Sequence, residues 1–422
     1  MHILYATAAY RPSSPISGAN LAVSCIAEAL VRRGHSVTVF TTDCSLEEDL
    51  DVPLAQPHEQ NGVQVWYFRR VEYLRRWLPF IPYISGSTGF FYAPRMAHHL
   101  HQVVASVDLV HTNNSFVYPT YAAAKAARRL GKPLFYHQRG ALDPEHLKYR
   151  SAKKRFYIAV VERPIMRDAT ALIALTEAET ASYRALGVTT PCRIVPNGVD
   201  VSSFRQEPSL EFDTKWRMPA QSLVILFLGR LVPSKGVEKL LHAFLSISAQ
   251  FPDAMLVIAG PDVCGLEKKY RKLACEAGLA DRIVFPGMVS GERKLDLLAR
   301  ADLFCLPSIA EGFSLAVLEA LASATPVLIS PGCHFPQVQA VGAGRIVSNE
   351  SNEIAKALAE LLSRPHTLRL MGERGRALVA REYSWDRITN ELIAVYREGL
   401  QHRKAESRQS ADPTRRRFYT SL

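Results

Sequence analysis

The chain has 422 residues, of which 48% are hydrophobic and 22% charged, and its formal net charge is +11. This length allows two domains of about 200 residues, each with its own core. The seven cysteines include no Cys-x-x-Cys pair, which argues against a disulfide framework or a zinc site and fits a reducing cytoplasm. The opening residues HILYAT are typical of a buried strand rather than of a secretory leader, so we expect a cytoplasmic protein.

Short apolar runs alternate with amphipathic stretches along the whole chain, which indicates βαβ units and parallel sheets. In the first half, helices are predicted at residues 20–33 and 119–130. Strands are predicted at residues 3–6, 36–41, 109–111, 133–137, 171–174 and 193–195. The VPNGVD segment then interrupts the pattern and predicts a domain boundary near residue 196.

The second half restarts with the same alternation. Its predicted strands are residues 223–228, 255–258, 282–285, 303–306, 327–329 and 345–347. A helix is predicted at 385–400, and the polar, Arg-rich residues beyond it predict a disordered tail. The fold class is therefore α/β, with two parallel-sheet domains.

Charged residues follow two of the predicted strands in the second half. Arg230 and Lys235 lie in a glycine-flanked loop after one strand, where a guanidinium and an ammonium group suit a diphosphate. Glu311 and Glu319 flank the start of an apolar helix whose first-turn amides, expected at Phe313, Ser314 and Leu315, favour anions. If both glutamates were helical, about 12 Å would separate them, which suits the two ends of one extended ligand.

Three predicted strands of the first half are followed by or end in further candidates. Gly18 begins a helix after a proline-containing loop and lets the backbone approach a ligand. His137 and Arg139 lie two residues apart, so on a strand they would share a face, while His111 ends another strand. A lone histidine of this kind is more often structural than functional.

The order and spacing of several motifs resemble retaining glycosyltransferases of family 4, which have the GT-B architecture. The motifs are SPISGANLAVSCIAEALVRRGHSVTVFTTD, RGALDP, ALIALTEAE, VPNGVD, GRLVPSKG and EGFSLAVLEALASAT. RGALDP and the stretch after it resemble the bacterial exopolysaccharide and surface-glycan subset. This sequence departs from the family pattern in having Ser17-Gly18 in place of two glycines, and in Ser234, Ala324 and Gln337.

The resemblance implies two Rossmann-like domains that face each other across a cleft. Residues 1–196 would bind the acceptor, residues 197–384 would bind the donor, the helix at 385–402 would cross back to the first domain, and 403–422 would form the basic tail. The reaction implied is hexose transfer from a nucleoside-diphosphate sugar to a glycan or lipid-linked acceptor, with retention. The implied catalytic group comprises His137, Arg139, Glu311, Arg230 and Lys235.

The implied donor site comprises Gly18, Arg230, Lys235, Glu311, Gly312, Phe313, Ser314, Leu315 and Glu319. Glu319 would bind the ribose and Glu311 the sugar. The acceptor cleft would contain His111, Asn113 and Arg139, and the sugar-proximal position is left open between His137 and Arg139. Because Arg230 and Lys235 can supply the charge neutralisation that a metal gives in other transferases, we expect no metal and no cofactor besides the sugar nucleotide.

The chain offers two segments to an anionic membrane surface. One is the uncharged, aromatic stretch 77–94 with arginines before it, and the other is the basic run KYRSAKKR at 148–155. Packing on the chain's own domain and simple solvation remain equally open. No nucleic-acid module is present. The alternative functions are a sugar-nucleotide epimerase of the same fold and a non-catalytic glycan- or nucleotide-binding subunit.

Overall fold

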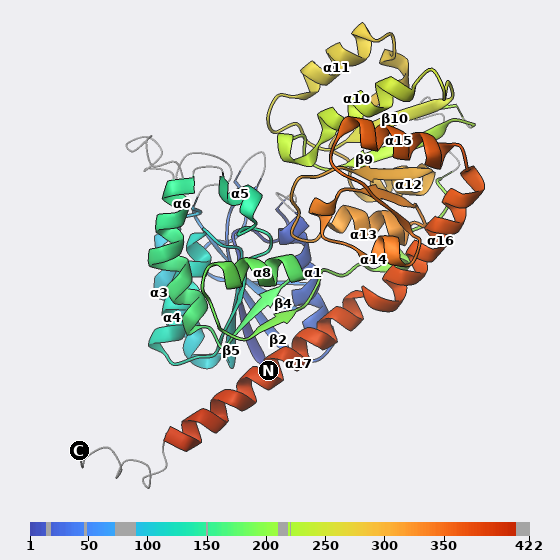
Figure 1. The fold of residues 1–422 in the computed structure, drawn as a ribbon. Helices are drawn as coiled ribbons and strands as arrows, with labels where there is room; N and C mark the ends of the chain where they lie inside the picture. Colours follow the sequence, from blue (N-terminus) through green and yellow to red (C-terminus); the bar gives the residue numbers. More distant parts are fainter. Residues whose placement is uncertain are drawn as a thin grey trace. The chain divides into compact units, whose positions relative to one another are not determined.

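The computed structural model describes residues 1–13, 18–45, 49–71, 90–148, 151–209, 218–219 and 221–410. The chain divides into two compact units: unit 1 is Met1–Pro196 with the segment from Asp386 on, and unit 2 is Asn197–Trp385. Each unit is built around a mainly parallel sheet (Figure 1), which confirms the predicted fold class. Ser17, most of the aromatic stretch 77–94, residues 149–150 of the basic run and the tail from 411 lie outside the described residues.

Unit 1 contains an eight-stranded sheet in the order β3-β4-β2-β1-β5-β6-β7-β8, parallel except for β3. Its strands are β1 (His2–Ala6), β2 (Ser36–Thr42), β3 (Pro57–Gln60), β4 (Val63–Phe68), β5 (Leu109–Asn113), β6 (Leu134–His137), β7 (Ala171–Ala174) and β8 (Cys192–Ile194). The β3–β4 hairpin was not predicted. It turns through Asn61 and Gly62, whose φ angles of 51° and 77° suit the tight two-residue turn that joins antiparallel strands.

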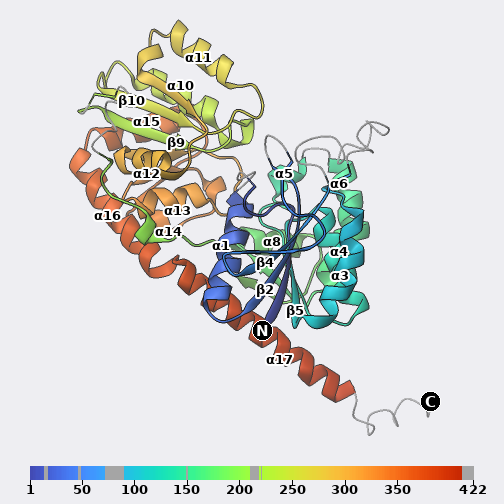
Figure 2. The same ribbon diagram turned by 180° about the vertical axis from the view of Figure 1, so that it is seen from behind.

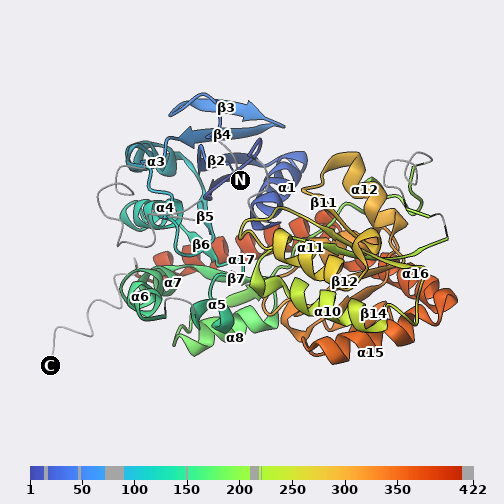
Figure 3. The ribbon, with the colours of Figure 1, turned by 90° about the horizontal axis from the view of Figure 1, so that it is seen from above.

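Helices cover both faces of this sheet. They are α1 (Gly18–Arg32), α3 (Pro94–Ser106), α4 (Tyr118–Arg129), α5 (Pro144–Lys148), α6 (Ser151–Tyr157), the π-helical η1 (Ile158–Glu162), α7 (Arg163–Asp168), α8 (Glu177–Ala185) and α17 (Trp385–Ser410). Figure 3 shows α3 and α4 on the opposite side of the sheet from α1. The core between the sheet and α3 and α4 includes Leu4, Val110 and Tyr136. Side chains alternate along a strand, so His111 faces the other way.

Helix α17 packs on that second face. Tyr396 stacks edge to face on Phe135 of β6, with 4.9 Å between the ring centroids. A Cβ at Gly399 would lie 2.7 Å from the ring of Phe135, so glycine allows the helix to approach the strand closely. The helix continues to Ser410, beyond the ends predicted at residues 400 and 402, so the first residues of the expected tail are helical. Its last turns contain Arg, Lys, Ala, Glu and Gln, which all favour helix once an amphipathic helix precedes them.

A buried carboxylate ties the loop after β5 to the π-helical turn. Glu162 ends η1, and its Oε1 accepts from the N–H of Phe116 at 2.7 Å. Its Oε2 accepts from the hydroxyl of Tyr136 at 2.6 Å, and that hydroxyl also lies 2.6 Å from Oγ of Ser115. Burial raises the pKa of Glu162 to about 7.

This raised pKa predicts that the stability of the protein falls as pH rises from about 4.5 to 7. In that range the folded protein binds more protons than the unfolded chain, so the full loss of about 3 kcal/mol is reached above pH 7. Glu162→Gln removes the ionisation, and its amide can still accept from the N–H of Phe116 while its N–H group donates to the hydroxyl of Tyr136. The difference in Tm between this variant and the wild type, measured by calorimetry, should therefore shift in favour of the variant as the pH is raised from 5 to 8. For the control variant Glu177→Gln, at an exposed position, this Tm difference should not change with pH. Equal changes in both variants would contradict the prediction.

Unit 2 contains a six-stranded parallel sheet in the order β11-β10-β9-β12-β13-β14. The strands are β9 (Leu223–Leu228), β10 (Ala254–Ala259), β11 (Ile283–Gly287), β12 (Leu303–Leu306), β13 (Val327–Ile329) and β14 (Gly344–Ile346). Strand order reverses between β9 and β12, where two successive crossovers diverge. Such a switch point is where parallel α/β sheets bind ligands, at the carboxyl ends of the strands.

The helices of unit 2 lie on both faces of its sheet, as Figure 2 shows for α10 and α13. They are η2 (Val201–Ser203), η3 (Pro233–Lys235), α10 (Val237–Ile247), α11 (Glu267–Glu276), η4 (Ala280–Arg282), α12 (Gly291–Arg300), α13 (Leu315–Ala322), η5 (Pro331–Cys333), α14 (Gln337–Ala340), α15 (Ser351–Leu362) and α16 (Pro365–Glu382). Ala324, a departure noted above, has φ of 59°, a left-handed conformation that favours glycine. No helix among the described residues is long and apolar enough to cross a membrane.

Candidate active site

The loop after β9 places two cations at the switch point of unit 2. The chain passes from β9 through Arg230 to the short helix η3, which ends at Lys235. Gly236 follows with φ of 72°, and a Cβ there would lie 2.1 Å from the carbonyl oxygen of Pro307. Glycine therefore lets this loop lie directly against the end of β12.

Lys235 meets Glu311 in the adjacent loop. The ammonium group forms an ion pair with Oε1 of the carboxylate, and the two side chains are 18% and 10% exposed. Arg230 is half-buried and makes no ion pair with any residue that the structure describes. A charge pair of this kind, held at the end of a parallel strand, can open to a ligand that carries both an anion and hydroxyl groups.

Backbone hydrogen bonds hold the loop of Glu311 in place. The N–H of Ile309 donates to the carbonyl of Ser234 at 2.7 Å, and the N–H of Glu311 donates to that of Gly332 at 2.8 Å. The hydroxyl of Ser308 also donates to the carbonyl of Ser234, at 3.0 Å. The loops after β9, β12 and β13 thus form one connected edge.

Helix α13 begins later than predicted. Ser314 is its N-cap and Leu315 its first residue, so the amides without an intrahelical partner belong to residues 314–317, which include Ser314 and Leu315 but not Phe313. Phe313 is 7% exposed and packs on Phe335 and Tyr383, at 4.8 and 5.5 Å between ring centroids. Because this aromatic contact holds the Gly312–Phe313 turn, Glu311 precedes the helix, and the axial spacing estimated for two helical glutamates does not apply.

Glu319 lies on the second turn of α13 and is 8% exposed. Its Oε1 accepts from Nζ of Lys294 in α12 at 2.8 Å, in a pair whose side chains are 11% and 22% exposed. Lys294 was not among the predicted site residues. It sits in the charged GERKLDLLAR segment, where only the spacing to the buried Leu297 and Leu298 could have placed it on the inner side.

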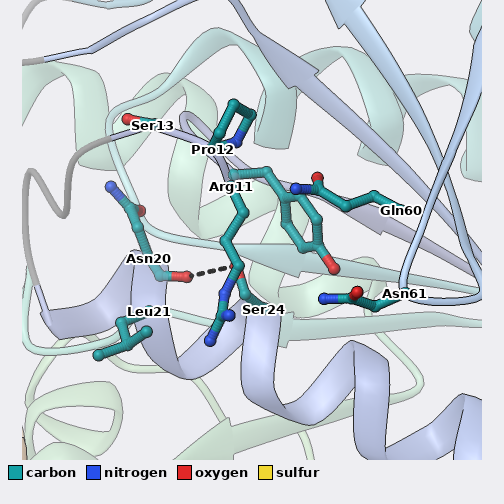
Figure 4. Close-up of a pocket in the computed structure, with 9 residues that line it drawn as sticks. Arg11, Pro12, Ser13, Asn20, Leu21, Ser24, Gln60 and Asn61 are labelled. Carbon is teal, nitrogen blue, oxygen red and sulfur yellow. Dashed lines mark hydrogen bonds between the residues drawn. The ribbon is translucent and has the colours of Figure 1, made fainter. Parts of the chain in front are cut away.

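In unit 1, the loop after β1 leads to Gly18, the exposed first residue of α1. A cavity of about 340 Å³ lies beside this loop and is lined by Tyr10, Arg11, Pro12, Ser13, Asn20, Leu21, Ser24, Gln60 and Asn61. Figure 4 shows Gln60 and Asn61 on the opposite side of it from Asn20 and Leu21. Gly18 itself does not line the cavity, and its predicted role stays a prediction.

The ends of β5 and β6 bring the other candidates of unit 1 together. His111 and His137 lie 5.7 Å apart between ring centroids, and Asn113 pairs in register with His137. Nε of Arg139 donates to Oδ1 of Asn113 at 2.8 Å. The predicted shared strand face for His137 and Arg139 is wrong, because β6 ends at His137 and Arg139 has φ of 53°. The chain turns there, yet Arg139 still joins the cluster.

Burial sets the protonation states of this cluster. It lowers the pKa values of His111 and His137 well below the ordinary value, and the nearby Arg139 charge lowers them further. Both rings are therefore neutral at pH 7. Burial also lowers the pKa of Arg139 to about 10, so its guanidinium stays charged. The cluster can thus donate hydrogen bonds to oxygen without gaining a second positive charge.

The site residues predicted from sequence form two groups. Gly18, His111, Asn113, His137 and Arg139 belong to unit 1, and the others, from Arg230 to Glu319, belong to unit 2. No group of three or more His, Cys, Asp or Glu side chains that could hold a metal occurs in the part of the chain that the structure describes.

Two family models match the chain in tandem. The glycosyl transferase 4-like domain matches residues 17–198, and glycosyl transferases group 1 matches residues 209–378. A D-inositol 3-phosphate glycosyltransferase of Saccharomonospora viridis is 28% identical over 400 residues, covering 91% of this chain and 89% of that protein. A GDP-mannose-dependent alpha-(1-6)-phosphatidylinositol monomannoside mannosyltransferase of Mycobacterium tuberculosis is 32% identical over 253 residues, covering 56% and 65%.

Solved structures share the fold. Anabaena HepE, in complex with UDP-glucose, superposes with a TM-score of 0.73 at 19% identity, covering 94% of this chain and 100% of that one. Sucrose-phosphate synthase from Thermosynechococcus elongatus superposes with a TM-score of 0.71 at 22% identity, covering 94% of this chain and 98% of that one. Fold and family models together define a glycosyltransferase of GT-B architecture. The chain belongs to glycosyltransferase family 4.

Proposed function

We propose that this protein transfers a hexose from a nucleoside-diphosphate sugar to an acceptor hydroxyl, with retention at the anomeric carbon. The observation that carries the proposal is the Lys235–Glu311 pair beside Arg230, at the carboxyl ends of β9 and β12. The names of two similar proteins support a sugar-nucleotide donor, because one depends on GDP-mannose and the other is a complex with UDP-glucose.

The charges of unit 2 suit the parts of such a donor. Arg230 and Lys235 neutralise the diphosphate, and the free amides at the start of α13 face its oxygens. Glu319 accepts from the ribose hydroxyls, and Glu311 accepts from the hydroxyls of the sugar. Without donor, the ammonium group of Lys235 pairs with Glu311. When the donor binds, Lys235 contacts a phosphate oxygen instead, so its positive charge stabilises the leaving diphosphate.

The chemistry proceeds on one face of the sugar. The bond from the anomeric carbon to the diphosphate oxygen breaks, the acceptor oxygen bonds to that carbon, and the acceptor proton passes to the departing diphosphate. The sugar and the acceptor are bound by the polar cluster of unit 1, which contains His111, Asn113, His137 and Arg139. Arg230 and Lys235 supply the positive charge that a metal would otherwise supply, so we expect the reaction to need none.

We further propose a lipid-linked glycan as acceptor, in exopolysaccharide or surface-polysaccharide synthesis, with the protein at the inner face of the membrane. The described part of the basic segment supports this. On α6 and η1, Phe156 is 72% exposed and Val160 is 56% exposed, and Lys153 and Arg155 beside them are exposed as well. Exposed apolar side chains among basic ones suit an anionic lipid surface.

This surface predicts binding to anionic vesicles. In flotation with phosphatidylglycerol vesicles, the double variant Phe156→Ser and Val160→Ser should bind about tenfold more weakly, because two apolar groups no longer enter the interface. Val263→Ser provides the control, since Val263 is 47% exposed in unit 2. Equal binding by all three proteins would remove the argument for a membrane role.

The decisive experiment measures nucleoside-diphosphate release from UDP-, GDP- and ADP-hexoses, with and without a bacterial lipid extract and with and without EDTA. Release from one donor that rises with the extract and resists EDTA supports the proposal, and NMR of the product reports the anomeric configuration. An altered hexose still attached to nucleotide would indicate the epimerase. Nucleotide binding without any turnover would indicate the non-catalytic subunit.

A further inference from the structure

One hydroxyl group of helix α17, that of Tyr396, contacts the cluster at the ends of β5 and β6. This cluster contains His111, Asn113, His137 and Arg139. The hydroxyl of Tyr396 is hydrogen-bonded to Nδ1 of His111 and lies 2.9 Å from the hydroxyl of Tyr5. All three side chains are at most 1% exposed. Tyr396 is near the end of the chain, whereas Tyr5 and His111 are on β1 and β5, so the contact joins sequence segments that are 391 and 285 residues apart.

The hydrogen atoms available allow two directions for these bonds. A neutral histidine has one N–H and each tyrosine has one O–H. If Tyr5 donates to Tyr396 and Tyr396 donates to Nδ1, both hydroxyl protons are used. In the reverse order, His111 donates from Nδ1, Tyr396 donates to Tyr5, and the proton of Tyr5 has no acceptor among the described residues. Each order thus leaves one buried donor without a partner, the O–H of Tyr5 in the second order and the Nε2–H of His111 in the first, at a cost of about 1–3 kcal/mol. The first order is favoured when a ligand binds, because it leaves the free hydrogen in the cluster with Asn113 and His137, where a bound oxygen can accept it.

The favoured order places the proton of His111 on Nε2. That atom is buried and has no hydrogen-bond partner among the described residues. The same holds for Nδ2 of Asn113 and for both ring nitrogens of His137. Buried polar atoms in folded proteins are normally paired, so this many open positions in one cluster indicate a bound group that is rich in oxygen.

We propose that Tyr396 is a positioning residue that, supported by Tyr5, holds His111 with Nε2–H as a donor to a hydroxyl or other oxygen of the bound acceptor or sugar. The inference rests on the proposed transferase function and assigns to α17 a part in the site. The close approach permitted by Gly399, and the contact of Tyr396 with Phe135, fix the distance of α17 from β6. The hydroxyl of Tyr396 is thereby held at a set depth.

The test uses the full-length protein labelled with ¹⁵N-histidine, with His111→Gln to assign the signal. Long-range ¹H–¹⁵N spectra should show His111 with a protonated Nε2. In Tyr396→Phe, His111 should no longer favour the tautomer protonated on Nε2. In Tyr5→Phe it should keep that tautomer, because Tyr396 still donates to Nδ1. Tyr396→Phe should also lower kcat about tenfold, the worth of one hydrogen bond, with the donor KM unchanged, and Tyr5→Phe should lower it less.

A wild-type signal from protonated Nδ1, or a larger kcat loss in Tyr5→Phe than in Tyr396→Phe, would overturn the proposal. An unchanged kcat in Tyr396→Phe would do so as well. Thermal unfolding of both variants separates a structural loss, which should be similar for the two, from the loss of positioning. If the wild type turned over no donor, the proposed function would fail, while the tautomer measurement would still decide the hydrogen-bond order.

Discussion

Replacing Lys235 with alanine should lower kcat/KM by a factor of about 10²–10³. Removal of a group that stabilises developing charge in an active site commonly has this effect. Here the loss has two causes, because the diphosphate loses a cation and Glu311, 10% exposed, remains as an unpaired negative charge facing it. The measurement is steady-state release of nucleoside diphosphate from the donor that the wild type accepts.

Lys239→Ala is the matched control, because Lys239 follows Lys235 by four residues, lies in α10 and pairs with the exposed Glu350. It should retain wild-type activity. The double variant Lys235→Ala with Glu311→Gln should bind nucleoside diphosphate better than Lys235→Ala alone, since it removes the unpaired carboxylate. Similar rates for Lys235→Ala and Lys239→Ala would exclude the assigned role.

Replacing Glu319 with glutamine should raise the donor KM about 10- to 100-fold and change kcat little. The carboxylate would accept hydrogen bonds from ribose in the ground state and the transition state alike, so its loss acts on binding. A hydrogen bond to a charged group contributes about 1.5–3 kcal/mol, which gives that range. Glutamine keeps the shape of a side chain that is 8% exposed, so α13 should remain folded.

Glu292→Gln controls for a charge change in the same unit, because Glu292 on α12 is 78% exposed and pairs with Arg205. Its KM should match the wild type. The affinity for the free sugar, measured by calorimetry, should not depend on Glu319 if the carboxylate serves the ribose. A fall in kcat at constant KM would assign Glu319 to the chemical step instead.

The alternating apolar pattern predicted the class of fold because buried parallel strands and amphipathic helices have different periods. Every strand of unit 2 was anticipated to within a few residues. The β3–β4 hairpin was missed, although Asn61-Gly62 is a strong turn signal. Its strands lie at the edge of the sheet, where β3 has mostly exposed side chains and so lacks an apolar run.

Within the site, sequence placed the residues whose position follows from a strand end. Lys235 and Glu311 meet because parallel strands end at the same edge of a sheet. The start of α13 could not be placed, because it depends on the packing of Phe313 against Phe335 and Tyr383, which come from later elements. The turn at Arg139 could not be foreseen either, because a left-handed arginine has no local signature.

Partners that lie far apart in sequence were beyond prediction. Lys294 and Glu319 are 25 residues apart on successive helices, and Tyr396 and Tyr5 are separated by nearly the whole chain. Their pairing follows from how helices pack on the sheets, which no local pattern specifies. The exposed Phe156 is a related case, since sequence shows an aromatic residue but not whether a neighbouring element covers it.

Because unit 1 includes α17, its core is completed by residues that the ribosome makes after unit 2. When the first 196 residues have emerged, the ring of Phe135 and the hydroxyl of Tyr5 lack the helix that covers them. Unit 2 is continuous in sequence and can fold as soon as it is made. Unit 1 is therefore begun before unit 2 but completed after it, and a chain cut short before α17 would present an open sheet face to chaperones and proteases.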